Sequence, residues 1–593
     1  MDEAAPTWDL EPICPGGPGG ETFIERHGAV AAEAAALRAR AEALGTLDDD
    51  PDAWQAVLLD LEAVRSRIHE LSTFATCSAS TDARSSDAQR AESLVDGLIQ
   101  SHRMVSVLVQ ATVTEASPDT YEAWASRPGL ADARPELDHT RSGRRFLLPR
   151  QQQLLATEMD RESLTGWGRL YNVVSGRLTA PMTVRGETRT VGVAELLSRL
   201  SDADHEVRCA AYQSQHEAWD GVKDICAHTL TQITGARQSR QDRLGVTPVS
   251  VSLHSNRLEQ STLDAMWTVA ETLRPTLVEY LSRKARLLGK ERLDWWDVDA
   301  PLQAEGAAPV TWDEVAANIE RAFGSYHPDL EAFARRAFHG RWIDAAPSEN
   351  RRAGGYCANL PLMGQSRIFM TFTGSHDNGM TLAHELGHAY HNHVISAEPT
   401  SRQRLTSALA ETASTFAEAL YRDQLIELAQ DASVRLLLLD AELQAAVAFL
   451  MNIPFRFQFE ERLYELRRNG ALDPDELSAE MVRLQRKSHG DALGSYSPLF
   501  WCSKLHYYIP SFGFYNWPYT FGYLFSAAVH ARAKAEGPAF LPVFQDLLRR
   551  TGWQATESLV AETMNADTSD PAFWATAAEP IEGKVRAFLE LTS

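Results

Sequence analysis

The sequence predicts a mainly α-helical protein with a small β element, and three observations predict this class. Apolar residues recur at helical spacing over long stretches, for example at Leu58, Leu61 and Val64. Up to about residue 170 the chain is rich in Ala, Leu, Glu and Arg, which are strong helix formers. The pattern typical of strands is confined to two short segments, residues 182–191 and 367–373.

The first half of the chain is expected to form two sets of helices separated by a hairpin. Residues 182–191 alternate around Arg185 and Gly186, which predicts the hairpin. Helical spacing resumes at about residues 193–290, and residues 301–309 read as a loop. We place a domain boundary at the hairpin. This gives an N-terminal helical lobe at 1–190 and a second domain at 191–593, with a core at about 350–530.

The second half of the chain carries a lone predicted strand at residues 367–373. A lone strand has exposed edges, and such an edge can pair with the backbone of an extended peptide. A turn at residues 374–379 follows the strand. Pro454 is an expected kink in one of the later helices. Helical pattern fills the remainder, over residues 381–394, 402–427, 434–468 and 519–593.

Composition excludes several classes of protein. With 57 Lys and Arg against 80 Asp and Glu, the net charge of −23 disfavours nucleic acid as a partner. The six cysteines form no C-x-x-C pair, which indicates free thiols in a reducing compartment, and we expect a cytoplasmic protein with no export signal. The most apolar stretch, residues 436–451, is interrupted by Asp440, Glu442 and Gln444. It predicts a buried helix, and no membrane partner is expected.

The motif that carries chemistry is H-E-x-x-H, formed by His384, Glu385 and His388. Residues four apart share a helix face, so the two imidazoles can converge on one Zn²⁺. Glu385 lies about 100° around the helix and can reach a metal-bound water. The bare motif occurs by chance in roughly a few per cent of chains of this length, so its context has to support it.

Three features supply that context. A hydrolytic zinc needs a third protein ligand, and Glu411 follows His388 by 23 residues on the next predicted helix. Residues 506–523 are dense in tyrosines, whose hydroxyls can donate hydrogen bonds to an oxyanion. The third feature is the exposed edge of the predicted strand. An accidental motif and purely structural tyrosines remain the alternatives.

Two neighbouring residues have open roles. His391 lies at i+3 from His388, where a structural or supporting role is favoured over that of a ligand, because three ligands already fill a catalytic zinc site. Glu418 lies two turns after Glu411 on one helix face. It can orient a ligand histidine, and an exposed carboxylate is an equally good interpretation.

Three segments resemble the signature blocks of oligoendopeptidase F, within the thimet oligopeptidase family of zinc metallopeptidases. They are residues 381–391 (TLAHELGHAYH), 411–418 (ETASTFAE) and 514–523 (FYNWPYTFGY), in the same order and spacing. Weaker similarity extends over most of the chain. The resemblance implies a two-lobed helical ellipsoid with a deep central channel, one zinc on its floor, and cleavage of short peptides inside it.

The resemblance also implies roles for individual residues. It matches His384, His388 and Glu411 to the zinc ligands, and Glu385 to the general base. His506, Tyr515, Tyr519 and Tyr523 correspond to the substrate-binding block of the family. Their spacing departs from the pattern of thimet oligopeptidase, so the tyrosine that contacts the oxyanion is left open.

We therefore expect a zinc-dependent oligoendopeptidase that cleaves internal bonds of short unstructured oligopeptides, with one Zn²⁺ per chain. A zinc carboxypeptidase or dipeptidyl carboxypeptidase is the alternative within enzymes. It would need a cationic pocket for the substrate carboxylate, for which the candidates are Arg351, Arg352, Arg456 and Lys504. A non-catalytic peptide-binding protein is the alternative from another class. The sequence does not determine the side-chain preference, the physiological peptides or the oligomeric state.

Overall fold

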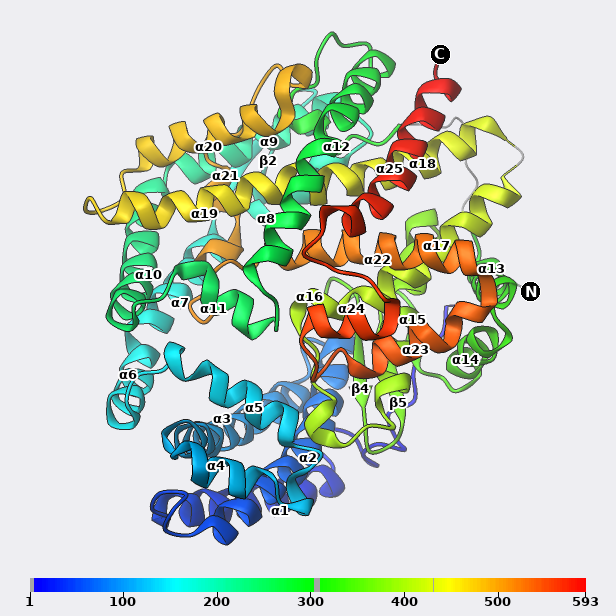
Figure 1. The fold of residues 1–593 in the computed structure, drawn as a ribbon. Coiled ribbons are helices and arrows are strands. Elements are labelled where there is room, and N and C mark those ends of the chain that lie inside the picture. Colours follow the sequence, from blue (N-terminus) through cyan, green and yellow to red (C-terminus); the bar gives the residue numbers. More distant parts are fainter. Residues whose placement is uncertain (1–4, 303–309, 430) are drawn as a thin grey trace. The chain divides into compact units, whose positions relative to one another are not determined.

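The computed structural model describes residues 5–302, 310–429 and 431–593 (Figure 1). They pack into two compact units, each built from three stretches of the chain. Unit 1 comprises Met1–Arg145, Ala308–Glu427 and Arg532–Asn565, and unit 2 comprises Phe146–Ala307, Leu428–Ala531 and Ala566–Ser593. The mainly helical class is confirmed. The boundary near residue 190 and the two-lobed shape with its channel stay predictions. The loop predicted at 301–309 lies almost wholly outside the described residues.

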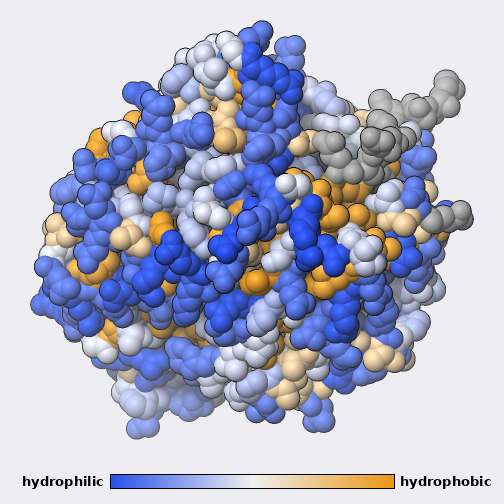
Figure 2. Space-filling view, turned by 90° about the horizontal axis from the view of Figure 1, so that it is seen from above, coloured by the Kyte–Doolittle hydropathy of each residue, from blue (hydrophilic) through white to orange (hydrophobic). Residues whose placement is uncertain are grey.

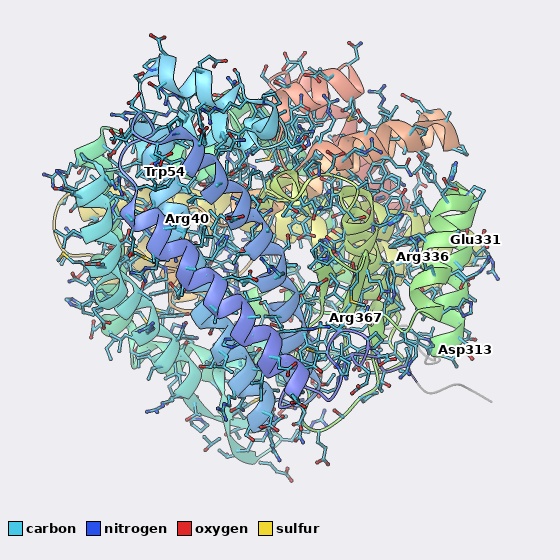
Figure 3. All side chains as sticks on the ribbon, turned by 90° about the horizontal axis from the view of Figure 1, so that it is seen from below. Arg40, Trp54, Asp313, Glu331, Arg336 and Arg367 are labelled. Carbon is cyan, nitrogen blue, oxygen red and sulfur yellow. The ribbon has the colours of Figure 1, made fainter. Side chains whose placement is uncertain are left out.

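Unit 1 begins with three long helices that pack side by side and enclose their own hydrophobic core (Figure 1). The predicted helical stripe is buried there, with Leu58 and Leu61 in the core. Figure 3 labels Trp54, whose indole Nε1 donates to Gly45 O at 3.1 Å and closes the connection between α1 and α2. The helices of this unit are α1 (Glu21–Ala43), α2 (Pro51–Thr81), α3 (Ser86–Glu115), α4 (Pro118–Ala125), α5 (Arg134–Ser142), α13 (Trp312–Tyr326), α14 (Pro328–His339), α15 (His376–Ile395), α16 (Ser407–Ala410), α17 (Thr412–Leu428), α23 (Leu541–Arg550) and α24 (Thr556–Met564).

The strand predicted at residues 367–373 is β5 (Gln365–Phe369), and it is not alone. It is the middle strand of a three-stranded sheet, parallel to β3 (Ile343–Asp344) and antiparallel to β4 (Tyr356–Leu360). The prediction of an exposed edge on this strand was therefore wrong. Its partners are only two and five residues long, and sequence pattern does not distinguish such short strands from loops. The sheet edge beside β5 is provided by β4.

Arg367 anchors the N-terminal segment to this sheet (Figure 3). Its side chain is buried, and one guanidinium nitrogen donates to Asp9 O at 3.2 Å while another donates to Ser366 O at 2.9 Å. The backbone N–H of Trp8 donates to Asp344 Oδ2 at 3.3 Å. The segment at Trp8 and Asp9 is therefore attached to strands that lie far along the sequence.

Unit 2 is also helical and contains the predicted hairpin. Its strands, β1 (Thr179–Val184) and β2 (Glu187–Gly192), pair in the expected register. Arg185 and Gly186 both have positive φ, at 51° and 83°, which is the geometry of a type I′ turn. The helices are α6 (Arg150–Glu162), α7 (Leu164–Arg177), α8 (Val193–Ser198), α9 (His205–Asp220), α10 (Lys223–Leu244), α11 (Pro248–Ser255), α12 (Gln260–Leu287), α18 (Ala432–Val447), α19 (Ile453–Arg467), α20 (Pro474–His489), α21 (Phe500–Ser503), α25 (Pro571–Leu591) and most of α22 (Trp517–Glu536).

The kink expected at Pro454 is a π-helical turn, Ala448–Asn452, between α18 and α19. Proline lacks a backbone N–H and crowds the carbonyl four residues earlier, and the wider π turn relieves this. Among the described residues, Ala432–Arg467 is the one helix long and apolar enough to cross a membrane by length and composition, and half of its most apolar window is buried. Asp440 and Glu442 form ion pairs inside unit 2 with Lys284 and Lys584, as in a core helix.

The face of the molecule shown in Figure 2 is mostly hydrophilic. Apolar residues occur on it in scattered groups. Exposed acidic and basic side chains are commonly paired, as Arg134 is with Glu122 at 2.7 Å. Pairs of this kind contribute little to stability, but they keep the surface soluble.

Candidate metal centre

The H-E-x-x-H motif lies in the middle of α15, where the sequence predicted a helix. The helix begins five residues earlier than expected, because Ser375 and Asn378 form a reciprocal capping box. His384 and His388 project from one face of this helix, with ring centroids 4.7 Å apart. The helical period therefore brings the two imidazoles together without help from another element.

Glu411 completes a group of three possible metal ligands. Its carboxylate Oε2 lies 3.4 Å from His384 Nε2 and 3.3 Å from His388 Nε2. The three ligand atoms all lie within 4.8 Å of one another. Glu411 was predicted inside a continuous helix at 402–427, whereas it occupies a one-residue break between α16 and α17. The break turns the carboxylate toward α15.

A close helix contact at Gly387 sets this distance. A Cβ atom built on Gly387 would lie 2.4 Å from Ala413 O and 2.5 Å from Ser414 Cα, both in the backbone of α17. Only glycine allows the two helices to approach so closely. The contact lies within one turn of both His388 and Glu411, so the Gly387 position controls the geometry of the ligand group.

Two side chains of α17 orient the ligands. Glu418 Oε1 lies 2.5 Å from His384 Nδ1, which directs the Nε2 atom of that imidazole at Glu411. Ser414 Oγ donates to Glu411 Oε2 at 2.7 Å. The sequence left the role of Glu418 open, and Ser414 was missed. A hydroxyl three residues after a candidate ligand on one helix was the available signal.

The carboxylates of the group control the charge of His384. Burial alone would lower the pKa of His384, but the facing carboxylates, Glu418 foremost, raise it to about 9. Burial would likewise raise the pKa of Glu411, yet the two histidines and Ser414 lower it to about 2. A metal ion taken up here would therefore displace a proton from His384.

Glu385, the acid of the motif, has one carboxylate oxygen without a hydrogen-bond partner among the described residues. This oxygen is Oε2, and the side chain is buried. Burial raises the pKa of Glu385 above that of an ordinary carboxyl. A Cβ built on Gly355 would lie 3.7 Å from Glu385 Oε1, so the start of β4 flanks this carboxylate.

His391 points away from the ligand group. Its Nε2 atom lies 2.9 Å from Thr551 Oγ1 and 3.2 Å from Leu548 O, so the ring is packed against α23. Burial lowers the pKa of His391 to about 4. A neutral, fully buried imidazole with these partners has the structural role that the sequence favoured.

The predicted aromatic block lies in unit 2, and part of it forms a cluster. The His506 ring packs against the tilted ring of Tyr515 and edge-to-face against Tyr519, with ring centroids 5.6 Å and 6.2 Å away. Tyr523 instead stacks on Phe449 at 5.0 Å. Of the three tyrosines named in the predicted block, Tyr515 and Tyr519 therefore pack on His506.

The four candidate cations for a carboxylate pocket separate into two kinds. Arg351 forms a buried ion pair with Asp344, and both guanidinium nitrogens of Arg352 contact Glu92 at 2.7 Å. These two arginines are therefore committed to unit 1. Arg456 and Lys504 lie in unit 2 and form no ion pair with a carboxylate of the described residues.

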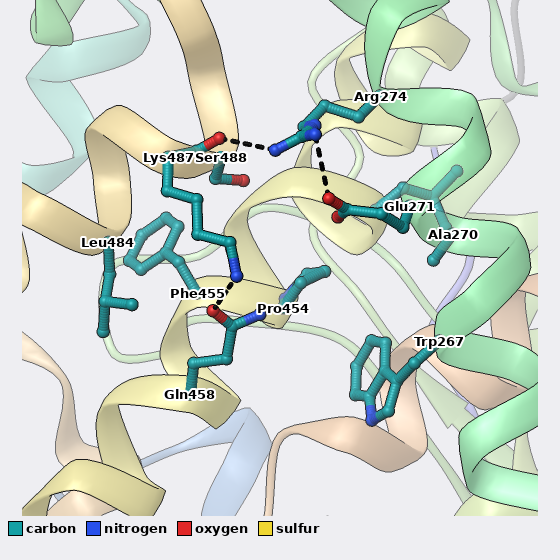
Figure 4. Close-up of a pocket in the computed structure, with 11 residues that line it drawn as sticks. Trp267, Ala270, Glu271, Arg274, Pro454, Phe455, Gln458, Leu484, Lys487 and Ser488 are labelled. Carbon is teal, nitrogen blue, oxygen red and sulfur yellow. Dashed lines mark hydrogen bonds and ion pairs between the residues drawn. The ribbon is translucent and has the colours of Figure 1, made fainter.

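A separate small pocket in unit 2, shown in Figure 4, holds no metal-ligand group. It has a volume of about 50 Å³ and opens where the π turn and Pro454 meet α12 and α20. Lys487 donates to Gln458 Oε1 at 3.1 Å across it, and Arg274 donates to Lys487 O at 2.8 Å (Figure 4). The Trp267 Nε1–H has no hydrogen-bond partner among the described residues, but the pocket is lined by no group of metal ligands, so it is not a candidate metal site.

Comparison with known proteins agrees with this geometry. The model of peptidase family M3 matches residues 198–578. Oligopeptidase PepF of Bacillus subtilis is 21% identical over 411 residues, which is 68% of this chain and 59% of that protein. A plasmid-encoded oligoendopeptidase F of Lactococcus lactis subsp. cremoris is 20% identical over 81% of this chain and 80% of its own. The chain spans little more than half the length of several relatives, including 51% of an oligopeptidase PepB of Streptococcus agalactiae.

Solved structures share the fold over nearly the whole chain. A protein of Chlamydophila abortus superposes with a TM-score of 0.82 and 18% identity, over 99% of this chain and 100% of its own. The oligoendopeptidase F of Enterococcus faecium has a TM-score of 0.71 and 18% identity, over 96% of this chain and 98% of its own. At this identity the likeness establishes the fold alone.

Proposed function

Because the chain belongs to peptidase family M3, we propose that it is a zinc-dependent oligoendopeptidase that hydrolyses internal bonds of short, unstructured peptides. The observation that carries the proposal is the convergence of His384, His388 and Glu411 beside the unpartnered carboxylate of Glu385. The names of the relatives, all oligopeptidases or oligoendopeptidases, support the substrate class.

The geometry of the three ligands fits zinc. Ligand atoms bound at about 2.0–2.1 Å at the corners of a tetrahedron lie about 3.4 Å apart. The separations of 3.4 Å and 3.3 Å from Glu411 Oε2 to the two Nε2 atoms agree with that value. Two histidines and one glutamate are also a donor set typical of catalytic zinc. We therefore propose one Zn²⁺ per chain at this position.

Glu385 is proposed as the general base. Bound Zn²⁺ would lower the pKa of a water toward about 7 and polarise the scissile carbonyl. The Glu385 carboxylate takes the proton of the attacking water and passes it to the leaving amine. Its burial suits this task, because the raised pKa moves the carboxyl closer to the pH at which it must both accept and release a proton.

Glu418 and Ser414 are proposed as positioning residues. By holding His384 Nδ1, Glu418 fixes the tautomer that presents Nε2 to the metal. Ser414 fixes one oxygen of Glu411 in the same way. Partners of this kind commonly contribute about 10- to 100-fold to metal affinity or activity.

The substrate backbone is proposed to pair with β4 instead of β5. β4 is one of the two edge strands of its sheet, and Gly355, the residue before it, lies close to the Glu385 carboxylate. One position on its outer side is used within the unit, where Thr73 Oγ1 donates to Asn359 O at 2.9 Å. The beginning of the strand, near Tyr356, is therefore the part proposed to bind an extended peptide.

The oxyanion contact is proposed for a tyrosine of the 515–523 block, with His506 orienting the substrate. The residue types and the resemblance support this assignment, and the packing of His506 on Tyr515 and Tyr519 adds to it. Phenolic hydroxyls donate readily to an oxyanion, and one such donor typically contributes about 3 to 4 kcal/mol. Free cysteines throughout the chain support a reducing, cytoplasmic location.

The experiment that tests the function combines metal analysis with product analysis. We expect one zinc per purified chain, loss of activity with chelators, and lower zinc occupancy in His384→Ala and Glu411→Ala. An internally quenched peptide should be cut at an internal bond, with both fragments detected by mass spectrometry. Release of only C-terminal residues or dipeptides would instead support the carboxypeptidase alternative, and absence of hydrolysis would support the peptide-binding one.

A further inference from the structure

Arg456 and Lys504 carry positive charge into the interior of unit 2, and neither forms an ion pair with a carboxylate of the described residues, although Asp299 is close enough to Lys504 to act on its charge. We propose that these two cations, with His506, form a site that binds a carboxylate of the peptide substrate. The inference deepens the proposed peptidase function and rests on it. The endopeptidase assignment does not explain how the enzyme would prefer an oligopeptide to a long chain. A site that binds the C-terminal carboxylate of the substrate would explain this preference.

Arg456 is the central group of this site. Its side chain is 8% exposed, and its Nε–H has no acceptor among the described residues. One terminal guanidinium nitrogen donates to His506 Nδ1 at 2.9 Å. A buried arginine is normally paired with an acid, because an unpaired buried charge is costly. The unused donor therefore indicates a ligand that arrives from outside the chain.

Glu460 does not neutralise Arg456. Its Oε1 atom accepts the backbone N–H of Phe514 at 2.7 Å, and its Oε2 atom has no partner in the described part of the chain. Burial raises the pKa of Glu460 to about 7, so this carboxyl is only partly ionised at neutral pH. Glu460 is thus a poor counter-ion for the guanidinium.

Lys504 provides the second cation. Its Nζ atom lies 4.4 Å from the centre of the Phe500 ring, a contact that holds the ammonium without neutralising it. Burial and then the charge of Arg456 lower the pKa of Lys504 to about 8, and Asp299 opposes this shift. The ammonium therefore remains mostly charged at neutral pH, and it lies within the field of the same guanidinium.

His506 contributes a neutral donor. An arginine nitrogen can only donate, so His506 Nδ1 accepts the bond from Arg456 and its Nε2 carries the proton. Burial, followed by the charges of Arg456 and Lys504, lowers the pKa of His506 to about 4, which keeps the ring neutral. The guanidinium of Arg456, the ammonium of Lys504 and the Nε2–H of His506 are all donors, and the two oxygens of a carboxylate can accept from such groups.

The ligand class follows from the reaction. Each peptide substrate brings one C-terminal carboxylate, which can remain charged while it is transferred from water to two cations. A small inorganic anion such as chloride shares this charge and can occupy the same donors. The two sources differ in one respect that can be measured: only the peptide carboxylate can be removed by amidation of the substrate.

The test compares one quenched peptide with a free C-terminal carboxylate and the same peptide with a C-terminal amide. In the wild type we expect kcat/KM to be about 10- to 100-fold higher for the acid, because a lost charged hydrogen bond has about that effect. In Lys504→Met the acid should lose most of this advantage, chiefly through KM. The matched control is Lys487→Met, an exposed lysine of the same unit bound to Gln458, which should keep the full ratio.

Binding without turnover gives a second measurement. Glu385→Gln protein should bind the acid more tightly than the amide by a similar factor, and Glu385→Gln combined with Lys504→Met should not. Arg456→Lys is the conservative variant, and it should retain part of the ratio. An unchanged acid-to-amide ratio in Lys504→Met would overturn the proposal. A ratio of one in the wild type would also overturn it, whereas failure of the wild type to cleave either peptide would refute the peptidase function itself.

Adding chloride to the assay distinguishes a peptide carboxylate from an inorganic anion as the ligand of this site. If Lys504 holds the peptide carboxylate, chloride should compete, raising KM for the acid and leaving KM for the amide unchanged. If chloride instead activates cleavage of both peptides equally, and Lys504→Met abolishes that activation, the site binds an inorganic anion and the substrate proposal is overturned.

Discussion

Gly387→Ala tests whether the contact between α15 and α17 sets the metal geometry. The new methyl group would lie 2.4 Å from Ala413 O and 2.5 Å from Ser414 Cα, whereas an ordinary contact is 3.4–4 Å. Both atoms belong to backbone, which cannot rotate out of the way. The two helices must therefore separate by about 1 Å, since contacts between heavy atoms are optimal near 3.5–4.0 Å.

The cost divides between stability and metal binding. Overpacking a tight contact typically lowers the free energy of unfolding by about 1–3 kcal/mol, and replacing a helical glycine by alanine raises it by about 1 kcal/mol. The net loss of stability should therefore be about 0–2 kcal/mol. Metal binding should suffer more. Ligand distances must hold within about 0.2 Å, and Ser414 and Glu411 both lie on the displaced segment. We expect zinc affinity to fall by about 10- to 100-fold, as for other losses of ligand support.

The measurement uses two assays and a matched control. Urea unfolding of the metal-free protein reports stability, and competition with a chromophoric chelator reports zinc affinity. Gly28→Ala is the control, because Gly28 lies in α1 with no heavy atom within 4 Å of its built Cβ. It should stabilise the protein by about 0.5–1 kcal/mol without affecting zinc. If Gly387→Ala behaves like Gly28→Ala in both assays, the tight helix contact is not what positions Glu411.

Four further predictions concern catalysis, pH and size. Glu385→Gln should retain zinc while kcat falls by at least about 100-fold, and near-normal turnover would assign the base elsewhere. Among Tyr515→Phe, Tyr519→Phe and Tyr523→Phe, at least one should lower kcat by about 100-fold with KM nearly unchanged, and three neutral variants would make the cluster structural. Burial lowers the pKa of His489 to about 4 from its ordinary value of 6.5, so the unfolded chain binds the proton first and stability falls as the pH drops below 6.5. The loss should be about 2 kcal/mol between pH 7.5 and 5.0, and urea unfolding of His489→Leu should show a correspondingly weaker pH dependence. Unstructured peptides of about 5 to 20 residues should be cleaved, whereas folded proteins should be cleaved little. A series of peptides of increasing length, with products identified by mass spectrometry, measures this, and efficient digestion of a native protein would refute the enclosed channel.

Several features could be predicted because they depend on residues close in sequence. The helix that carries His384 and His388 follows from its own periodicity, and the i, i+4 spacing alone brings the imidazoles together. The hairpin around Arg185 and Gly186 also formed as expected, since a two-residue turn fixes its own register. Glu411 was predicted from chemistry, because a hydrolytic zinc needs a third protein ligand and Glu411 is an acid on the next predicted helix.

The sequence by itself determined the helical class and placed the H-E-x-x-H motif on a helix, because both follow from local spacing and residue type. Only the tertiary structure decided the sheet order that places β4 at an edge, the helix break that turns Glu411 toward α15, and the Arg456 donor that has no acceptor among the described residues. The physical reason is the range of the interactions. Helix periodicity and turn geometry act over a few residues, whereas strand pairing, helix approach at Gly387 and the burial of a charge depend on segments far apart in the chain.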